Sequence, residues 1–584
     1  MRRMLGMATS AAFMVVLCNG VSAQMLTSVP DNAAVFIRVK NLEQTSKKIG
    51  GLLQDWGISA MQPALADPLA AMEGMGNIQQ GLNRTGEAAF VMFNPMTVAQ
   101  NGDPFVILLP VTDYAAFLTN FAGALADGDV TEITMPTDGS PAFVAKWGTY
   151  AAISPNKQLV AARPQATKAT GLTGKQLAER DVTAYVNFSG FRTQVVGYLG
   201  FGRMMLAGQI DQNASATSQQ AKFKPVAKVA VNQLFSGLEH FINETQAITF
   251  GADFAPDGVQ VTMMTEFMPD SYLGKLASQW KSQPTVVGVG LPEGQYAIVG
   301  STSLDGAALS QLLDDMAGPV LAEAKKLGAD AQPAIDYFDA MKSMFKATKV
   351  QQFGLSAGQG KPGEAGIFAL VTTMQGDSKV IIDAQTRVAT LQEQLVKMVA
   401  PDAPQQSTVE LKKAAKTVDG VSFDQITNTF TDNTANDMVR KIYGKSGSTM
   451  LMGAVNESTA LVITPRDDAG ISSAIAAAKA GKSTIAEQPQ TKQVAAKLPA
   501  NPMFSVLMYG DQLMEIVTRA SEAFAASPID AKLPAGTPPL GMTMSTEGSA
   551  VRMDYYIPSP LVKAAASEII ARQHKRQLAP VGAL

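Results

Sequence analysis

The chain has 584 residues, of which 46% are hydrophobic and only 17% are charged, and its formal net charge is −3. This composition excludes a disordered chain and lacks the basic excess typical of nucleic-acid-binding proteins. The single cysteine excludes a disulfide framework and a cysteine-built zinc site, and the two histidines leave little room for His-based metal or triad chemistry.

The first 23 residues are typical of a secretory signal peptide. Arg2 and Arg3 precede an apolar run at 4–17, and a small-residue cleavage pattern follows and ends at Ala23. We expect cleavage after Ala23, a mature chain without cysteine, and a secreted or periplasmic location. A lipoprotein and an uncleaved anchor stay open, because Cys18 ends the apolar run. No later stretch approaches the roughly 18 consecutive apolar residues of a transmembrane helix.

Repeated short motifs predict two related halves. A Val-Pro or Leu-Pro pair precedes a strand at 29–39 and again at 291–299, and a short apolar strand ends in Ser-Pro or Thr-Pro at 152–155 and 462–465. The longest match joins residues 251–275 to 541–563. Each copy has an acidic-Gly turn, an alternating strand, an aromatic-x-Pro end and a following helix. The alternative is that similar hairpins recur by chance.

We therefore expect an α+β fold with two tandem, duplicated halves at 24–284 and 285–570, in which antiparallel sheets pack against amphipathic helices, and a flexible tail at 571–584. The apolar residues at 388, 391, 395 and 399 have helical spacing, and the apolar run at 105–111 predicts a strand covered on both faces. We also expect Gly50-Gly51 to weaken a helix at 42–56 and Gly318-Pro319 to interrupt another. Flexible joints are predicted at 209–220, 401–408, 487–492 and 527–539.

No residue is predicted to be catalytic, cofactor-binding or metal-binding. His240 lies beside Glu239 in an expected helix at 226–242, where it is either a general base or a residue on the helix surface. The segment 481–483 resembles the end of a phosphate-binding loop, but Ala476 occupies the position of the required first glycine. The adjacent pairs Asp314-Asp315 and Asp467-Asp468 present their carboxylates in different directions on a helix.

The 30 methionines are the one unusual feature of the composition. They predict one of three arrangements: filling of the core, an adaptable apolar groove or cavity for a lipid or peptide, or a soft-metal site built from thioethers. Periodicity places most of them on apolar strand or helix faces, which favours the first.

The motifs Val29-Pro30-Asp31 and Leu291-Pro292-Glu293, with the strand-Pro-Ser-helix ends at Pro269 and Pro558, resemble large exported proteins of unknown function from planctomycete-type bacteria. The resemblance brings no catalytic residues, and it implies a periplasmic or cell-envelope location.

These observations predict an exported, non-enzymatic envelope protein that serves as a binding or scaffolding module. One alternative is a carrier of an apolar ligand in a Met- and Phe-lined cavity, and a second is a hydrolase that uses carboxylates distant in sequence. We expect no cofactor and no nucleic-acid partner. The partners left open are an envelope protein and an apolar ligand.

Overall fold

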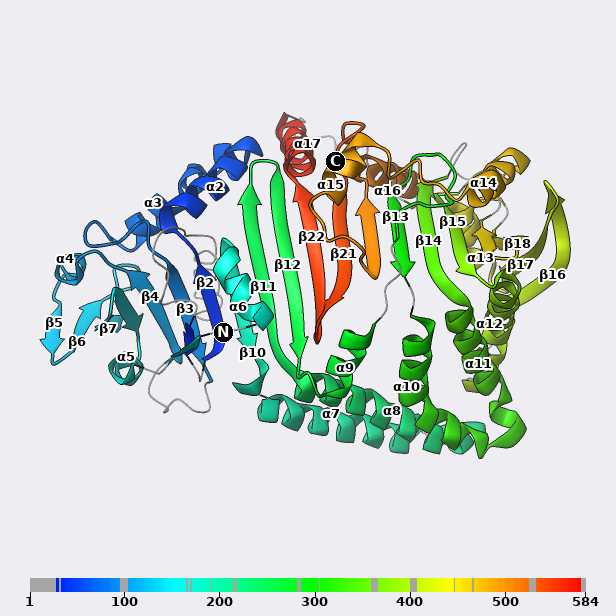
Figure 1. Ribbon diagram of the computed structural model, residues 1–584, viewed down its shortest axis with the longest axis horizontal. Coiled ribbons are helices and arrows are strands. Elements are labelled where there is room, and N and C mark those ends of the chain that lie inside the picture. Colours follow the sequence, from blue (N-terminus) through cyan, green and yellow to red (C-terminus); the bar gives the residue numbers. More distant parts are fainter. Residues whose placement is uncertain are drawn as a thin grey trace. The chain divides into compact units, whose positions relative to one another are not determined.

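The computed structural model describes residues 28–30, 33–94, 103–163, 166–168, 171–190, 192–213, 218–280, 285–303, 305–358, 366–399, 407–445, 447–464, 467–524 and 532–578. The expected signal peptide and Cys18 lie outside these residues. The chain has the expected α+β fold, with antiparallel strands and many helices (Figure 1). It forms two compact units. Within the described residues, unit 1 contains those up to Val195, Ile242–Gly274 and those from Ser549 onward, and unit 2 contains Val196–Phe241 and Lys275–Gly548.

The described strands of unit 1 form an antiparallel sheet in the order β5-β6-β7-β8-β4-β3-β2-β10-β11-β12-β22. A separate pair joins β1 to β9. The bounds are β1 (Ser28–Pro30), β2 (Ala33–Val39), β3 (Ala88–Phe93), β4 (Phe105–Pro110), β5 (Leu125–Asp127), β6 (Val130–Thr134), β7 (Pro141–Trp147), β8 (Tyr150–Ser154), β9 (Ala166–Lys168), β10 (Val182–Asn187), β11 (Thr245–Ala255), β12 (Gly258–Phe267) and β22 (Ala550–Pro558).

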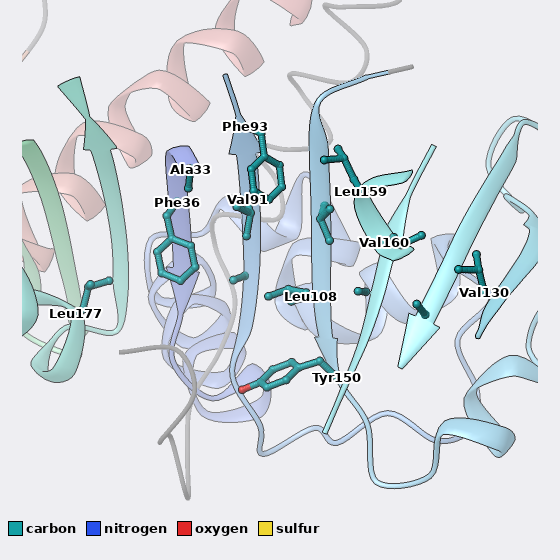
Figure 2. Close-up of a cluster of buried hydrophobic side chains, with 14 residues drawn as sticks. Ala33, Phe36, Val91, Phe93, Leu108, Val130, Tyr150, Leu159, Val160 and Leu177 are labelled. Atoms are coloured by element: carbon teal, nitrogen blue, oxygen red, sulfur yellow. The ribbon is translucent and has the colours of Figure 1, made fainter. Parts of the chain in front are cut away.

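The sheet of unit 1 is covered on both faces, because alternate residues of one strand enter different cores. In β8, Tyr150 and Ala152 belong to one buried cluster, shown in Figure 2, whereas Ala151 and Ile153 belong to another. β4 divides in the same way, so the prediction of a two-sided strand at 105–111 is confirmed. The covering helices are α2 (Leu42–Asp55), α3 (Pro68–Met75), α4 (Tyr114–Leu118), α5 (Lys157–Ala162) and α6 (Gly171–Glu179), and the short helices are η1 (Ile58–Ala60), η2 (Pro63–Ala66) and η3 (Phe188–Gly190).

Helix α2 runs through the Gly50-Gly51 pair that was expected to weaken it. Asn41 caps its first turn by accepting a hydrogen bond of 2.7 Å from the backbone N–H of Gln44. A Cβ atom at Gly50 would lie 2.2 Å from the carbonyl oxygen of Ala66, so the chain can approach the helix here only at a glycine. Gly51 has no such neighbour within 4 Å.

The described strands of unit 2 pair in the order β16-β17-β18-β19-β15-β14-β13-β20-β21. Their bounds are β13 (Ile298–Ser303), β14 (Thr348–Ala357), β15 (Phe368–Gly376), β16 (Ser407–Val418), β17 (Val421–Phe430), β18 (Ser448–Asn456), β19 (Thr459–Ile463), β20 (Phe504–Met508) and β21 (Leu540–Glu547). The helices are α10 (Gly306–Lys325), α11 (Gln332–Ala347), α12 (Ser378–Val399), α13 (Asn433–Tyr443), α14 (Asp468–Ala480), α15 (Pro489–Ala495) and α16 (Gly510–Phe524), with the short helix η4 (Gly328–Ala331).

Four further helices complete the description: α7 (Arg192–Asn213), α8 (Ser218–Glu244), α9 (Tyr272–Gln279) and α17 (Ser559–Leu578). Among the described residues, no helix is both long enough and apolar enough to cross a membrane.

Four local predictions are wrong. The expected joint at 209–220 is helical in its described parts, because α7 runs to Asn213 and α8 begins at Ser218. Helix α10 continues through Pro319, because burial of Ala317 and Ala324 outweighs the local propensity of proline to break a helix. The expected joint at 487–492 contains the start of α15, where Pro489 occupies the first turn and loses no intrahelical hydrogen bond. The expected tail from 571 is helical as far as Leu578.

The nine strands β5-β6-β7-β8-β4-β3-β2-β10-β11 of unit 1 follow the same pairing order, in the same chain order, as the nine described strands of unit 2 from β16 to β21. Helices also stand at corresponding places, for example α2 and α3 between β2 and β3, and α10 and α11 between β13 and β14. The duplication itself stays a prediction.

The two units differ from the predicted halves in two segments. Val196–Phe241 precedes the predicted boundary at 284 but belongs to unit 2, where Lys222 on α8 forms an ion pair with Asp330. The described residues from Ser549 onward follow that boundary but belong to unit 1, because β22 pairs with β12 from Gly258–Pro558 to Glu266–Ala550. Contacts between segments that are far apart in the sequence therefore determine to which unit each segment belongs.

Candidate functional site

A polar cleft lies at one end of the central strands of unit 2. Its larger lobe has a volume of about 500 Å³ and its smaller lobe about 150 Å³, and the two share Gln295, Asp511, Gln512 and Ala535. The chain places these residues together because β13, β14, β20 and β21 are neighbouring antiparallel strands. The start of β13, the end of β14, the end of β20 and the start of β21 therefore meet at the same edge.

One wall of the cleft comes from α16, which begins directly after β20. Asp511, Glu515 and Arg519 all line the larger lobe, and their spacing of four residues puts them on one side of the helix. The Arg519 Nε atom donates to Glu515 Oε1 at 2.9 Å. Asp511 accepts hydrogen bonds from the backbone N–H of Gln512 at 2.9 Å and from its side-chain Nε2 at 3.4 Å. This wall therefore presents both signs of charge.

The other walls add amides, hydroxyls and a further cation. Lys532 lies in the segment before β21 and contributes to the larger lobe, whereas Gln488 and Gln490 contribute to the smaller lobe. Glutamine side chains can both donate and accept hydrogen bonds. The lining therefore suits a ligand that carries charge and amide groups.

Two buried tyrosines, Tyr296 and Tyr509, line the smaller lobe. The Tyr509 hydroxyl is 2.7 Å from the Thr491 hydroxyl, and the Tyr296 hydroxyl donates to the carbonyl of Pro292 at 2.8 Å. Burial raises the pKa of Tyr509, the hydrogen bond with Thr491 opposes this rise, and the negative charge of Asp511 adds to it. Both hydroxyls thus have protein partners, and Tyr509 is a neutral phenol at physiological pH.

The cleft does not have the arrangement that the hydrolase alternative predicts. That alternative requires two carboxylates on opposite sides of a cleft. Asp511 and Glu515 instead come from successive turns of the same helix, and each has the hydrogen-bonded partners given above.

The cleft also differs from the cavity predicted for a carrier of an apolar ligand, because none of the described residues that line either lobe is Met or Phe. Two sets of methionines differ sharply in burial. Met264, Met374 and Met452 are each 1% exposed and fill the cores, whereas Met204 and Met205 on α7 are 68% and 53% exposed. Core filling therefore accounts for the first group only.

The other residues considered from the sequence occupy ordinary structural positions. His240 lies on α8, four residues before the helix ends, and the neighbouring Glu239 forms an ion pair of 2.6 Å with Arg203. Gly481 ends α14 with a left-handed backbone, so the segment 481–483 follows a helix instead of the strand that a phosphate-binding loop requires. Asp467 caps α14 by accepting from the backbone N–H of Gly470 at 2.9 Å. His574 lies on α17.

Within the described residues, no group of three or more His, Cys, Asp or Glu side chains is placed to hold a metal ion. The adjacent acids at 314–315 lie on α10, where Lys342 Nζ donates to Asp314 Oδ1 at 2.6 Å.

Sequence reasoning missed every polar residue of the cleft. The spacing of Asp511, Glu515 and Arg519 is visible in the sequence as one polar side of an expected helix, which usually means no more than a solvated surface. Nothing in the sequence joins that helix to Gln295 or Lys532, because only the strand order brings them to the same edge.

Sequence reasoning also missed a buried charged network in unit 1. Asp554 on β22 is fully buried, and it accepts hydrogen bonds from Arg552 Nε at 2.7 Å and from the Thr262 hydroxyl at 2.6 Å. The Thr262 oxygen in turn accepts from Arg180 Nη2 at 2.8 Å. Every charge in this chain of contacts has a partner, so the network serves to hold β12 and β22 together.

The sequence matches no protein-family model and no curated protein. Solved structures to which the chain is similar are crystal forms III, IV and I of TP0453, with 8%, 8% and 7% identity. The matches cover 49%, 49% and 48% of this chain and 99%, 97% and 98% of those chains, with TM-scores of 0.20, 0.19 and 0.20. At these TM-scores, no property of TP0453 carries over to this chain.

Proposed function

We propose that the protein is an exported, non-enzymatic binding module of the cell envelope, and that the unit 2 cleft binds a short peptide-like ligand with both signs of charge. The observation that carries this proposal is the mixed lining of the cleft. Asp511 and Glu515 supply carboxylates, Arg519 and Lys532 supply cations, and glutamine amides lie between them.

The size of the cleft supports a small ligand. A volume of about 500 Å³ in the larger lobe falls in the range of roughly 300–1,000 Å³ that is typical of ligand pockets. The end of β14 contributes the small residues Ser356, Ala357 and Gly358 to the lining of the larger lobe. A polar lining favours such a ligand over a lipid.

Binding is tested with a tripeptide of lysine, glycine and glutamate as the probe, with triglycine blocked at both ends as its neutral counterpart. We expect the purified protein to bind the charged tripeptide in calorimetric titration and the neutral one at least about tenfold more weakly, since the charged groups find partners in the cleft. Equal affinity for the two probes, or no binding of either, would contradict the proposal.

A pair of variants assigns the binding to the cleft. Asp511→Ala combined with Lys532→Ala removes one charge of each sign, so we expect the affinity for the charged tripeptide to fall at least about tenfold without loss of the fold. Asp437→Ala combined with Lys412→Ala removes two exposed charges elsewhere in unit 2, with side chains 70% and 57% exposed, and is expected to bind as the unaltered chain does.

The envelope location rests on the N-terminal sequence and needs its own test. Cell fractionation followed by N-terminal sequencing is expected to recover the protein outside the cytoplasm with Gln24 as its first residue. Recovery of the protein from the cytoplasm with Met1 still present would contradict the envelope location, but it would not affect the proposal that the cleft binds a ligand.

A further inference from the structure

The two lobes of the unit 2 cleft differ in charge. Asp511 lines both lobes, and it is the only charged residue in the described lining of the smaller one. The second acid, Glu515, and the two cations, Arg519 and Lys532, line the larger lobe only. The smaller lobe is therefore negative, whereas the larger lobe carries both signs of charge.

The carboxylate of Asp511 has no cationic partner among the described residues. It accepts from the backbone N–H of Gln512 at 2.9 Å and from its side-chain Nε2 at 3.4 Å. Glu515 differs, because Arg519 Nε lies 2.9 Å from its Oε1 atom. Asp511 also lies in the first turn of α16, where the helix dipole stabilises a negative charge. A half-buried carboxylate whose partners are amides alone can take a cation from a ligand.

The smaller lobe also contains the rings of Tyr296 and Tyr509. Their hydroxyls are already bonded to the Pro292 carbonyl and the Thr491 hydroxyl, so each tyrosine offers its ring to a ligand. Burial raises the pKa of Tyr509, and the negative charge of Asp511 adds to this rise, so the carboxylate lies near that ring. An aromatic ring attracts a cation through the negative face of its π-system and packs against methylene groups.

Glutamine side chains supply hydrogen-bond acceptors around the same lobe. Gln490 Nε2 donates to Gln488 Oε1 at 3.0 Å, which holds two of these side chains together. Gln295 and Gln512 belong to both lobes and therefore lie where the lobes meet. An ammonium donates three hydrogen bonds and accepts none. Asp511 and the amide oxygens around it therefore suit a ligand group of this kind.

The volume of the smaller lobe limits the group that fits. A volume of about 150 Å³ corresponds to roughly five groups of the size of a water molecule, at about 30 Å³ each. A lysine side chain has about that number of non-hydrogen atoms, in a four-carbon stem and an ammonium nitrogen. An arginine side chain is larger and ends in a rigid planar group. The lobe therefore matches lysine in size and in chemistry.

We propose that the smaller lobe binds a lysine side chain of the ligand, with its ammonium on Asp511 and its methylenes against the two tyrosine rings. The carboxylate of the ligand then lies in the larger lobe, which Arg519 and Lys532 line. This inference rests on the proposed function and gives the bound peptide a direction. It also assigns the specificity for lysine to one carboxylate.

Calorimetric titration with three peptides tests the inference. The first is the tripeptide of lysine, glycine and glutamate, and the second is the same peptide acetylated at its terminal amine. The third is the acetylated peptide with norleucine in place of lysine, which keeps the methylenes and lacks the ammonium. We expect the first two to bind within about threefold of each other and the norleucine peptide at least about tenfold more weakly, because Asp511 then lacks its cation.

Two matched variants assign this discrimination to Asp511. In Asp511→Asn the side chain keeps its shape and loses its charge, so we expect the acetylated lysine and norleucine peptides to bind within about threefold of each other. Lys532→Gln removes a charge from the larger lobe instead. We expect it to weaken the binding of both peptides alike and to preserve the difference of about tenfold between them.

A third variant locates the lysine side chain in the smaller lobe. Gly294 lines that lobe only, and a Cβ atom there would meet nothing closer than Tyr296 Cε2 at 3.8 Å. Gly294→Leu therefore adds a side chain to the wall without displacing the backbone, and we expect the lysine peptide to bind at least about tenfold more weakly. Gly318→Leu on α10, where a Cβ atom has no neighbour within 4 Å, is expected to bind as the unaltered chain does. Circular dichroism checks that both variants fold.

Failure of this inference can be told apart from failure of the proposed function. If none of the three peptides binds, both are wrong. If the lysine peptides bind, the lysine subsite is overturned by equal affinity for the norleucine peptide, or by a difference that Asp511→Asn does not reduce. Loss of binding on acetylation would assign the ammonium site to the peptide terminus, and unchanged binding by Gly294→Leu would place the lysine outside the smaller lobe. These last results leave the proposed function in place.

Discussion

The hydroxyl of Thr262 donates a 2.6 Å hydrogen bond to the carboxylate of Asp554, a residue 292 positions later in the chain. Asp554 also accepts from Arg552 Nε at 2.7 Å and Nη2 at 2.9 Å, and its side chain is fully buried. A buried carboxylate is stable only with such partners, so the three residues join the last strand of unit 1 to β12 by side chains as well as by the backbone.

Removal of this carboxylate should destabilise unit 1. Asp554→Ala removes a fully buried carboxylate that accepts hydrogen bonds from Thr262 and Arg552, and we expect the free energy of unfolding to fall by about 3 kcal/mol. Urea unfolding followed by circular dichroism measures the loss. Asp437→Ala, at a side chain that is 70% exposed, should change the stability by less than about 0.5 kcal/mol. Equal effects of the two substitutions would show that Asp554 has no structural role.

The two adjacent glycines of α2 should respond to alanine in opposite directions. Gly50→Ala places a Cβ atom 2.2 Å from the Ala66 carbonyl, so the chain must shift, and we expect a loss of about 2 kcal/mol or more. Gly51→Ala meets no atom within 4 Å and improves helix propensity, so a gain of up to about 1 kcal/mol is expected. The stabilities of the two variants are compared with that of the unaltered chain by thermal unfolding in the same buffer. A gain in stability at both positions would contradict the contact assigned to Gly50.

Tyr556 should make stability depend on alkaline pH. Burial raises its pKa from about 10 to about 12, and the negative charge of Asp257 adds to this rise. The folded state therefore keeps the phenol proton after the unfolded chain has lost it. The contribution of the neutral phenol is complete below pH 10 and decreases as the pH rises from 10 to about 12, by about 2 to 3 kcal/mol in total.

The phenylalanine variant isolates this effect. Burial also raises the pKa of Tyr114, Tyr185 and Tyr509, so the unaltered chain loses stability at high pH for several reasons. The measured quantity is the melting temperature at pH 8 and pH 11 for the unaltered chain and for Tyr556→Phe. We expect a smaller decrease in the variant. Identical decreases in melting temperature for the two proteins would show that Tyr556 does not contribute to the loss of stability at alkaline pH.

In a chain that ends at Glu547, the backbone amides of β12 should be poorly protected from hydrogen exchange. Nine residues of β12, from Gly258 to Glu266, pair with β22, and that partner is absent from the shortened chain. We expect backbone amides of β12 to exchange with deuterium at least about a hundredfold faster, because local opening costs less free energy. A chain that ends at Leu578 keeps β22 and α17 and should exchange at the original rate.

Local features of the fold could be predicted from the sequence, and long-range pairing could not. The Asp257-Gly258 pair predicts the hairpin of β11 and β12, which the structure has, with Pro256 and Asp257 in the turn and Gly258 as the first residue of β12. Nothing in the sequence says that β12 takes β22 as its other neighbour, because the two strands are nearly 300 residues apart. Similarly, the acidic and basic side of α16 could be predicted, but not its meeting with Lys532.

We propose that the shared pairing order of the two units arose by duplication of one ancestral sheet. The proposal is tested with an experimental structure, by superposing β2, β3, β4 and β10 on β13, β14, β15 and β20 without reference to sequence. We expect the four strands to coincide with their connecting segments on equivalent sides. Superposition only after a change of strand order would contradict a duplication.

The pairing of β12 with β22 also determines when the sheet of unit 1 can be completed during synthesis of the chain. Unit 1 begins near the N-terminus but cannot complete its sheet until the residues of β22 have been synthesised. At about 5–20 residues per second, the ribosome needs roughly 15 to 60 seconds to pass from one strand to the other. During that interval the first unit lacks its last strand. Until β22 has been synthesised, the sheet of unit 1 is incomplete, and an incompletely folded chain is the substrate that an export machinery for unfolded polypeptides would accept.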